Sequence, residues 1–277
     1  MTRVLAMLLF ISVAFLQANS QNTDSTKVTN DSIKATSTKV MSDSTAVTKN
    51  LVKMNLSSLF LGNYVVQYER VIGKKSSLAF ALGYAPNAEL PFKETLMDNF
   101  GDNETAKKAI ESTVYTRWTY TLEYRYYLGK AAPKGLYLAP FIRGMNMELE
   151  QDYPFTPSDG LQHVATVSSK FNAFGGGLML GAQWLPKKHW GVDFWIIGAY
   201  YGSNLDAKFH GTDPIGGLTP QDMTDLENVI EGVDLPGYTI DATVTQDPSG
   251  KPTIVDATLT GNWYGFRGAG ICLVYRF

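Results

Sequence analysis

The residues of this sequence that could do chemistry are few and far apart. None of the three histidines, His163, His189 and His210, has a Ser and an acid at a spacing that would place a catalytic triad on adjacent strand ends. The single cysteine, Cys272, excludes an intramolecular disulfide framework and any multi-cysteine zinc or iron–sulfur site. We therefore expect no enzyme, no metal site and no cofactor.

A second set of residues carries charges or amides at alternating positions, where strands would point them into an interior. The set is Gln67, Glu69, Glu123, Arg125, Arg143, Gln183, Asp193 and Arg276. Buried charges are tolerated when they are paired and hydrogen-bonded, and this set holds as many bases as acids. The pattern predicts a polar network that fills the interior. A gated ion path or a ligand site is the alternative.

The elements that must position these side chains alternate with a period of two from residue 51 onward. In residues 117–128, RWTYTLEYRYYL, one face carries Trp118, Leu122 and Tyr124, and the other carries Glu123 and Arg125. In an outer-membrane barrel the apolar face meets lipid and the polar face lines the lumen, whereas in a secreted β-sandwich the apolar face meets a second sheet. Aromatic residues near the segment ends favour the barrel.

The lengths of the connections point the same way. Short connections at 73–75, 129–135 and 186–189 alternate with long insertions at 87–115, 149–170 and 202–261, which is typical of bacterial outer-membrane barrels with short periplasmic turns. We predict an all-β, antiparallel transmembrane β-barrel over residues 51–277. Its eight strands are expected at 52–61, 64–72, 76–86, 116–128, 136–148, 171–185, 189–201 and 262–277.

Two extracellular loops are expected to contain structure of their own. Thr219-Pro220-Gln221-Asp222 predicts a helix start, with Thr219 as N-cap, and the helix should continue to Glu231 and pack over the barrel mouth rather than bind a partner. Residues 104–114 favour a second short helix. Residues 238–246 and 252–259 predict a β-hairpin, which either extends the wall or adds two spanning strands and makes ten.

The two ends of the chain indicate its destination. Residues 1–20 have the basic start, the 13-residue apolar run and the small residues of a cleaved signal peptide, and the run is too short to span a bilayer as a helix. Residues 21–50 are rich in Ser, Thr and Asp, have no aromatic residue and are expected to form a disordered periplasmic leader. The chain ends at Tyr275-Arg276-Phe277, which resembles the C-terminal signal read by the barrel-assembly machinery.

The composition of the chain limits the classes of partner that we expect. The charge balance is 24 basic against 26 acidic residues, and charged residues make up 18% of the chain. A nucleic-acid partner would need a clustered basic surface, so none is expected. Outer-membrane lipid, the assembly machinery and an unknown surface partner are the partners that the pattern predicts.

Three short motifs and four longer stretches resemble known sequences. Asp24-Ser25-Thr26, Asp31-Ser32-Ile33 and Asp43-Ser44-Thr45 resemble the periplasmic O-glycosylation sequon of Bacteroidota, which would place glycans on Ser25, Ser32 and Ser44; the composition of the tract is the alternative explanation. Residues 55–78, 124–143, 175–202 and the end WYGFRGAGICLVYRF resemble an uncharacterised family of Bacteroidota outer-membrane β-barrels. That resemblance implies a fold and a location, and it brings no activity.

Two functions of different classes follow. The first is a closed barrel with a structural or surface-binding role, whose lumen is plugged by paired charges. The second is a narrow pore or a small-molecule transport channel.

Overall fold

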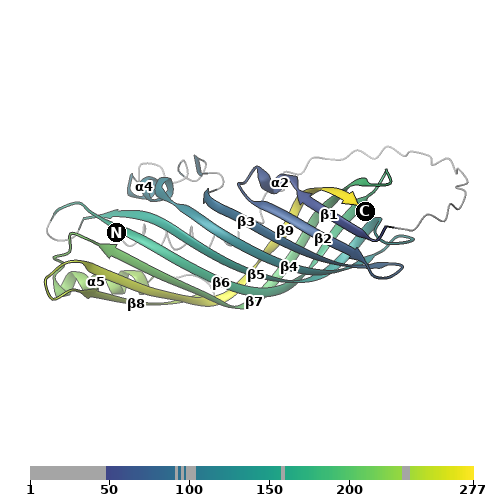
Figure 1. Cartoon of the computed structure of the whole chain (residues 1–277). Coiled ribbons are helices and arrows are strands. Elements are labelled where there is room, and N and C mark those ends of the chain that lie inside the picture. Colours follow the sequence, from purple (N-terminus) through teal and green to yellow (C-terminus); the bar gives the residue numbers. More distant parts are fainter. Residues whose placement is uncertain (1–47, 91–92, 95–96, 98–103, 157–159, 233–237) are drawn as a thin grey trace, which may run out of the picture.

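The computed structural model describes residues 48–90, 93–94, 97, 104–156, 160–232 and 238–277 (Figure 1). The predicted signal peptide, the leader up to residue 47 and the three glycosylation motifs lie outside these residues. The strands are β1 (Asn50–Asn55), β2 (Tyr64–Val71), β3 (Ser76–Glu89), β4 (Val114–Tyr127), β5 (Gly135–Phe155), β6 (His163–Trp184), β7 (Trp190–Asp213), β8 (Tyr238–Gln246) and β9 (Thr253–Arg276). The helices are α2 (Leu56–Leu59), α4 (Glu104–Ser112) and α5 (Pro220–Glu231).

The strands form one antiparallel sheet that closes on itself. Each strand from β1 to β7 pairs with the next, β7 pairs with β9, and β9 returns to β1. The ring is sealed at the chain end, where the Phe277 N–H donates to Asn50 O at 2.9 Å and the Asn50 N–H donates to Phe277 O at 3.3 Å. The predicted antiparallel β-barrel is therefore confirmed as a fold.

The number of strands differs from both predicted counts. Among the described residues the sheet has nine strands, of which eight form the ring and β8 pairs only with the first half of β9. The predicted hairpin exists, but its second arm and the last predicted strand are one continuous strand, β9. The hairpin therefore extends the wall beyond the ring and adds no pair of spanning strands.

The wall is uneven in height (Figure 1). β1 and β2 are short, whereas β5, β6, β7 and β9 have 21 to 24 residues and continue into stretches predicted as loops. The short turns lie together with the C-terminus at one end of the barrel, which we call the turn end. The helices α4 and α5 lie toward the opposite, loop end (Figure 1).

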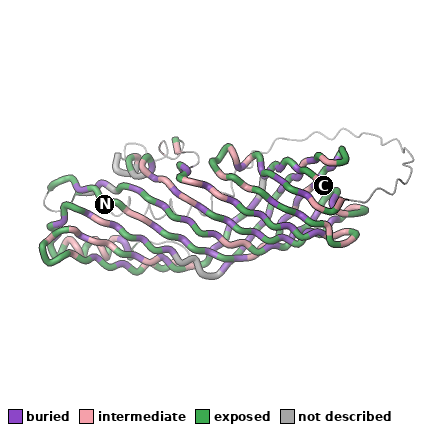
Figure 2. The backbone as a smooth tube through the Cα atoms, in the orientation of Figure 1, coloured by how far each residue is buried: buried purple, intermediate pink, exposed green. Residues whose placement is uncertain are grey.

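Burial alternates along almost every strand (Figure 2), and the outward residues change character along the wall. Near the turn end the outward positions are apolar, as in Leu122, Tyr124 and Phe194, each about 40% exposed. Further along the same strands the outward positions become polar, at Asn146, Glu148 and Glu150 in β5, Lys170 and Asn172 in β6, Lys208 and His210 in β7, and Thr260 and Asn262 in β9. Most inward positions stay buried along the whole wall. Strands β5, β6, β7 and β9 are therefore longer than the strands predicted at 136–148, 171–185, 189–201 and 262–277.

Alternation inverts in mid-strand in two adjacent strands, β7 and β9. Ile196 and Ile197 of β7 are both exposed, although they are neighbours. In β9, Arg267 and Gly270 are both buried at a spacing of three, so the face changes between them. Such irregularities re-aim side chains in a strand. Tyr200 is consequently buried and Ile197 exposed, opposite to the faces that regular alternation from the buried Asp193 would give them.

The helix α2 fills a gap in the ring beside β9. On the same side, β9 pairs with β8 over residues 253–261 and with β1 over residues 272–276. α2 begins directly after β1, with the Asn55 side chain accepting from the Ser58 N–H at 3.0 Å, and the Ile271 N–H of β9 donates to Ser57 Oγ at 3.2 Å. The predicted strand at 52–61 is therefore wrong beyond Asn55.

The helix α5 was predicted with its start and end, and both are confirmed. Thr219 and Asp222 form a capping box, and Pro220 occupies the first turn. The carboxylates of Glu227 and Glu231 accept from the Val244 and Ala242 N–H groups, at 2.7 and 3.1 Å. These N–H groups lie on the outer edge of β8, so the helix blocks an edge that another strand could otherwise pair with.

The inside of the barrel is layered. Toward the loop end the interior is an apolar core, in which Phe171 and Phe209 meet edge to face at 5.5 Å and which Ile110 of α4 and Ile230 of α5 complete. Toward the turn end the interior is polar and charged. The candidate site lies in this polar layer and directly above it.

Candidate functional site

The polar layer holds a network of charges supplied by strands from around the ring. Lys53 comes from β1, Glu69 from β2, Glu123 and Arg125 from β4, Asp193 from β7 and Arg267 from β9, and all six are buried. Strand β3 leaves room for them, because its inward residues opposite Glu69 and Glu123 are small, with Ala79 between the two carboxylates in register. Gly181 of β6 similarly makes space for Tyr137, whose hydroxyl would lie 2.3 Å from a Cβ at that position.

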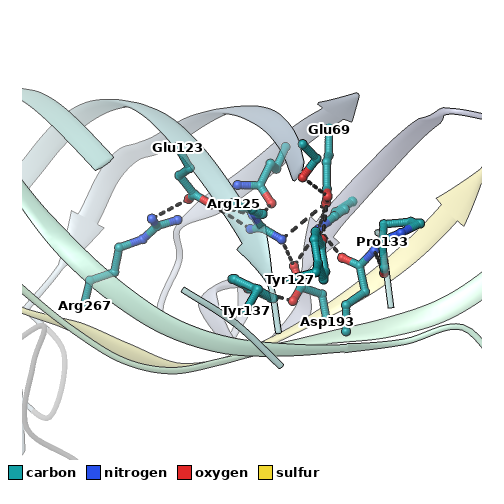
Figure 3. A network of polar contacts seen from close by, with 12 residues as sticks. Glu69, Glu123, Arg125, Tyr127, Pro133, Tyr137, Asp193 and Arg267 are labelled. Carbon is teal, nitrogen blue, oxygen red and sulfur yellow. Dashed lines mark hydrogen bonds and ion pairs between the residues drawn. The ribbon is translucent and has the colours of Figure 1, made fainter. Parts of the chain in front are cut away.

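Arg125 is the centre of the network (Figure 3). Its guanidinium donates to Glu123 Oε2 at 2.8 Å, to Asp193 Oδ2 at 2.7 Å and to Gln67 Oε1 at 2.8 Å, and it lies 3.3 Å from Glu69 Oε2. The guanidinium carbon lies 4.4 Å from the centre of the Tyr137 ring. Elements from around the ring are thus tied to one fully buried cation.

Lys53 is the second cation of the network. Its ammonium donates to Asp193 Oδ2 at 2.7 Å and to Gln183 Oε1 at 2.5 Å, and it forms an ion pair with Glu69. Gln183 in turn donates to Pro133 O at 2.8 Å, which joins the network to the turn between β4 and β5. The contacts therefore reach the turn end of the barrel.

Hydroxyl groups satisfy the remaining carboxylate oxygens. Tyr127 donates to Glu69 Oε1 at 2.6 Å, Ser77 donates to the same oxygen, and Tyr137 donates to Asp193 Oδ1 at 2.8 Å. Buried ions are tolerated only when their hydrogen-bonding capacity is met in this way. The polar core therefore joins strands from several sides of the ring through hydrogen bonds and ion pairs.

Arg267 extends the network toward the loop end. It donates to Glu123 Oε1 at 2.5 Å, and its guanidinium carbon lies 4.1 Å from the Trp195 ring centre. Beyond it lies a cavity of about 160 Å³, bounded on one side by Asn55 and the segment of α2. Arg117, Arg143 and Arg267 line this cavity, together with Thr119, Thr121, Trp195 and Tyr200.

Six of the eight residues predicted for the lumen network are found together. Gln67, Glu69, Glu123, Arg125 and Asp193 form the contacts described above, and Gln183 joins them. Arg143 lies higher, at the cavity, where it donates to Thr121 Oγ1 at 3.4 Å. Arg276 lies at the turn end and donates to Thr48 O at 2.7 Å. The ion pairs of the network, as far as the described residues show them, include neither of these two arginines.

Two charged members of the network, Lys53 and Arg267, are absent from the set predicted from sequence. Lys53 carried a usable signal, because it stands between Val52 and Met54, which are exposed apolar residues of an alternating strand. The sequence gives no such signal for Arg267. Regular alternation from the exposed Tyr275 would place Arg267 on the lipid face. The inversion in β9 turns it inward.

Among the described residues, His163 and His210 each contact a carboxylate. His163, expected in a loop, is buried at the start of β6 with Nδ1 2.6 Å from Asp213 Oδ2, and His210 lies 2.7 Å from Asp256. Within the described ranges no group of three or more His, Cys, Asp or Glu side chains is placed to hold a metal ion. Among the helices that the structure describes, none combines the length and the hydropathy needed to span a bilayer.

One protein-family model matches the chain. The family model described as "Protein of unknown function (DUF3575)" matches residues 33–218. No curated protein matches the chain.

Solved structures of two kinds are similar over most of the chain. The major outer membrane protein from Thermus thermophilus is 15% identical with a TM-score of 0.40, over 84% of this chain and 100% of that one. CarO2 and CarO from Acinetobacter baumannii are 13% and 12% identical with TM-scores of 0.35, over 78% of this chain and 97% of theirs. At these scores the likeness carries no argument about function.

Proposed function

The chain belongs to the DUF3575 family of proteins of unknown function, and we propose that it is an outer-membrane β-barrel whose lumen is plugged by the Arg125 network. In this proposal the turn end faces the periplasm and the loop end faces outward. The role is structural or surface-binding and not enzymatic. The origin of the chain in Bacteroidota, which the sequence resemblance suggests, belongs to the same proposal.

The observation that carries the membrane assignment is the outward apolar band. It runs from Leu136 to Gly144 in β5, from Phe174 to Trp184 in β6, from Trp190 to Tyr201 in β7 and from Tyr264 to Tyr275 in β9. These stretches span about nine to twelve residues, and a tilted strand needs roughly 9 to 11 to cross the hydrocarbon core. A ring without an open edge is also what a strand structure requires in lipid, because every backbone group must find a partner.

Aromatic side chains at the borders of the band support the same assignment. Trp184, Trp190, Tyr275 and Phe277 are exposed near the turn end, and the ring of Tyr275 lies 4.9 Å from that of Trp190 and 6.3 Å from that of Phe277. Trp and Tyr prefer the membrane–water interface. They are placed where a periplasmic aromatic girdle would lie.

The plug is supported by the geometry of the network. An eight-stranded ring is just wide enough for its inward side chains to fill it. Here the side chains of Lys53, Glu69, Arg125 and Asp193 meet from opposite walls, and all are fully buried. Ions would have to break several of these contacts to pass.

Conductance in planar lipid bilayers tests the plug. We expect the wild-type protein to show no steady conductance of ion size, and Arg125→Ala, which removes the central cation, to produce discrete openings. Arg70→Ala is the matched control, because Arg70 is exposed on the outside of β2, and it should behave as wild type. Steady conductance of the wild-type protein would instead support a narrow pore or transport channel.

A further inference from the structure

The cavity above the plug collects more positive charge than the structure neutralises. The buried and partly buried charges of the network and cavity are five bases, Lys53, Arg117, Arg125, Arg143 and Arg267, against three acids, Glu69, Glu123 and Asp193. All three acids lie in the plug or at its upper edge. The excess therefore belongs to Arg117 and Arg143, which both line the cavity.

Neither of these two arginines has a carboxylate partner among the described residues. The contact of Arg143 is with Thr121 Oγ1, at 3.4 Å, which is long for a hydrogen bond. Arg117 is 5% exposed, its Nε has no hydrogen-bond partner, and its guanidinium carbon lies 5.5 Å from the Tyr115 ring centre. A buried guanidinium left in this state is costly, so a native structure that keeps one calls for an explanation.

Other groups on the cavity wall add donors. The Trp195 indole N–H is buried, lacks a hydrogen-bond partner and can only donate. Thr119 and Thr121 supply hydroxyl groups from the same wall, and no Asp or Glu is among the described residues that line the cavity. Arg117 and Trp195 thus bring unsatisfied donors to the wall of one cavity, which also carries one unsatisfied acceptor, Asn63 Oδ1.

We propose that this cavity is a binding site for a small anion, carrying a phosphate, sulfate or carboxylate group held by Arg117, Arg143 and the Trp195 N–H. Guanidinium groups recognise such oxyanions through paired N–H donors. The volume of about 160 Å³ is close to that of the engineered cavity of about 150 Å³ that admits benzene, so a ligand of a few heavy atoms fits. The site lies above the plug, and the proposed anion binding does not depend on whether the barrel conducts ions.

Arg267 would serve this site as a positioning residue. It is already bound to Glu123 (Figure 3), and its guanidinium is stacked against Trp195, so it fixes the wall that carries the indole N–H. The anion site is thereby attached to the plug through the ion pair of Arg267 with Glu123.

Titration calorimetry with inorganic phosphate, sulfate and succinate tests the proposal on the full chain. The protein is held in a maltoside detergent, which carries no phosphate, so that binding of a free anion is separated from capture of a lipid headgroup. We expect saturable binding of at least one probe, which chloride weakens, and a rise in the melting temperature when that probe is added.

Variants assign the binding to the cavity. Arg117→Gln together with Arg143→Gln should lower the affinity at least tenfold and abolish the melting shift, because the two unpaired cations are gone. Arg70→Gln, outside the barrel, should leave both unchanged. Heat-modifiable migration in gels checks that each variant is folded.

Three outcomes would overturn the proposal. The first is no saturable binding of any probe up to about 10 mM, well above the dissociation constants of roughly 1 mM that correspond to weak sites. The others are unchanged affinity in the folded double variant, or a loss of affinity in Arg70→Gln equal to that in the double variant. Binding only to vesicles that carry anionic lipid, with none of the free probes, would assign the arginines to a headgroup and also reject a free-anion site.

Discussion

At the scale of single residues, the plug depends on carboxylates that each serve two cations. Glu123 accepts from Arg125 at 2.8 Å and from Arg267 at 2.5 Å, and it is fully buried. Removing one partner of a buried ion pair leaves an uncompensated charge, whereas an exposed pair contributes little. The same substitution should therefore have different effects in the plug and on the surface.

We predict that Glu123→Ala destabilises the folded barrel by about 3 to 5 kcal/mol. Glu148→Ala is the matched control, because it breaks an exposed pair with Lys170 and should cost about 1 kcal/mol or less. Urea unfolding in lipid vesicles measures both. Equal costs for the two variants would mean that Glu123 is not a member of a buried network.

The hairpin turn between β8 and β9 contains a carboxylate that should titrate unusually low. Ser249 donates to Asp247 Oδ1 through its hydroxyl at 2.6 Å and its N–H at 2.8 Å, and these bonds hold the pKa of Asp247 below its ordinary value. A lowered folded-state pKa means that the stabilising effect is present above the ordinary Asp value and is lost as pH falls through the lowered one.

We predict that Ser249→Ala raises the pKa of Asp247 toward its ordinary value. NMR titration of the Asp247 carboxyl in the wild type and the variant measures the change. The exposed Asp225, which accepts from the Gln221 amide at 2.8 Å, serves as the reference group. If the substitution left the Asp247 titration unmoved, the turn contacts would not be the cause.

At the scale of elements, alternation was predictive where it is regular and misleading where it inverts. Strand β4 keeps one parity from Tyr115 to Tyr127, so Glu123 and Arg125 were placed correctly from sequence. β7 and β9 change parity in mid-strand, so regular alternation along these strands gives the wrong face for Arg267 and Tyr200. An inversion is set by packing between strands that are far apart in sequence, and a local pattern does not contain it.

The predicted strands are shorter than the observed ones for a second reason. The outward face of β5, β6 and β7 changes from apolar to polar while the inward face stays buried, as at Met147 and Phe171. Polar outward residues beside Gly and Ser look like loop sequence, although the strand continues. The capping box of α5, by contrast, depends only on residues within one turn and was predicted in full.

We predict that Glu227→Ala together with Glu231→Ala unprotects the edge of β8. The Val244 and Ala242 amides lose their acceptors, and a hydrogen bond to a charged group contributes about 1.5 kcal/mol or more, so their exchange should accelerate at least tenfold. Hydrogen exchange measures this, with Asp225→Ala as the control on the same helix. Unchanged protection would show that α5 does not shield the edge.

At the scale of the whole molecule, the C-terminal residue closes the ring. Phe277 pairs with Asn50 through its backbone and stacks on Tyr275. Deletion of Phe277 should therefore lower the amount of heat-modifiable barrel in the outer membrane, because both the seam and the expected assembly signal are damaged. Phe60→Ala, which removes a 90% exposed aromatic beside α2, is the control and should insert normally. Equal levels of the truncated and full-length proteins would contradict this.

Over the apolar band, the polarity of the barrel is the reverse of that of a water-soluble protein. Apolar side chains face outward over the band, charges meet inside it, and an apolar core fills only the extension beyond it. In a water-soluble barrel the outward band would be exposed to solvent over its whole circumference, which soluble proteins avoid. We therefore expect the band around the ring to meet lipid.

Leu122→Arg tests this lipid contact most directly, because Leu122 lies midway along the apolar face of β4, between Trp118 and Tyr126, and is 40% exposed. In lipid vesicles the substitution should cost about 2 to 4 kcal/mol of unfolding free energy, as expected for Arg at the bilayer midplane. Thr243→Arg, exposed on β8 beyond the band, should change stability by no more than about 0.5 kcal/mol. Urea unfolding of both variants in the same vesicles gives the answer: a large cost confined to Leu122→Arg supports the membrane barrel, and equal tolerance of both arginines contradicts it.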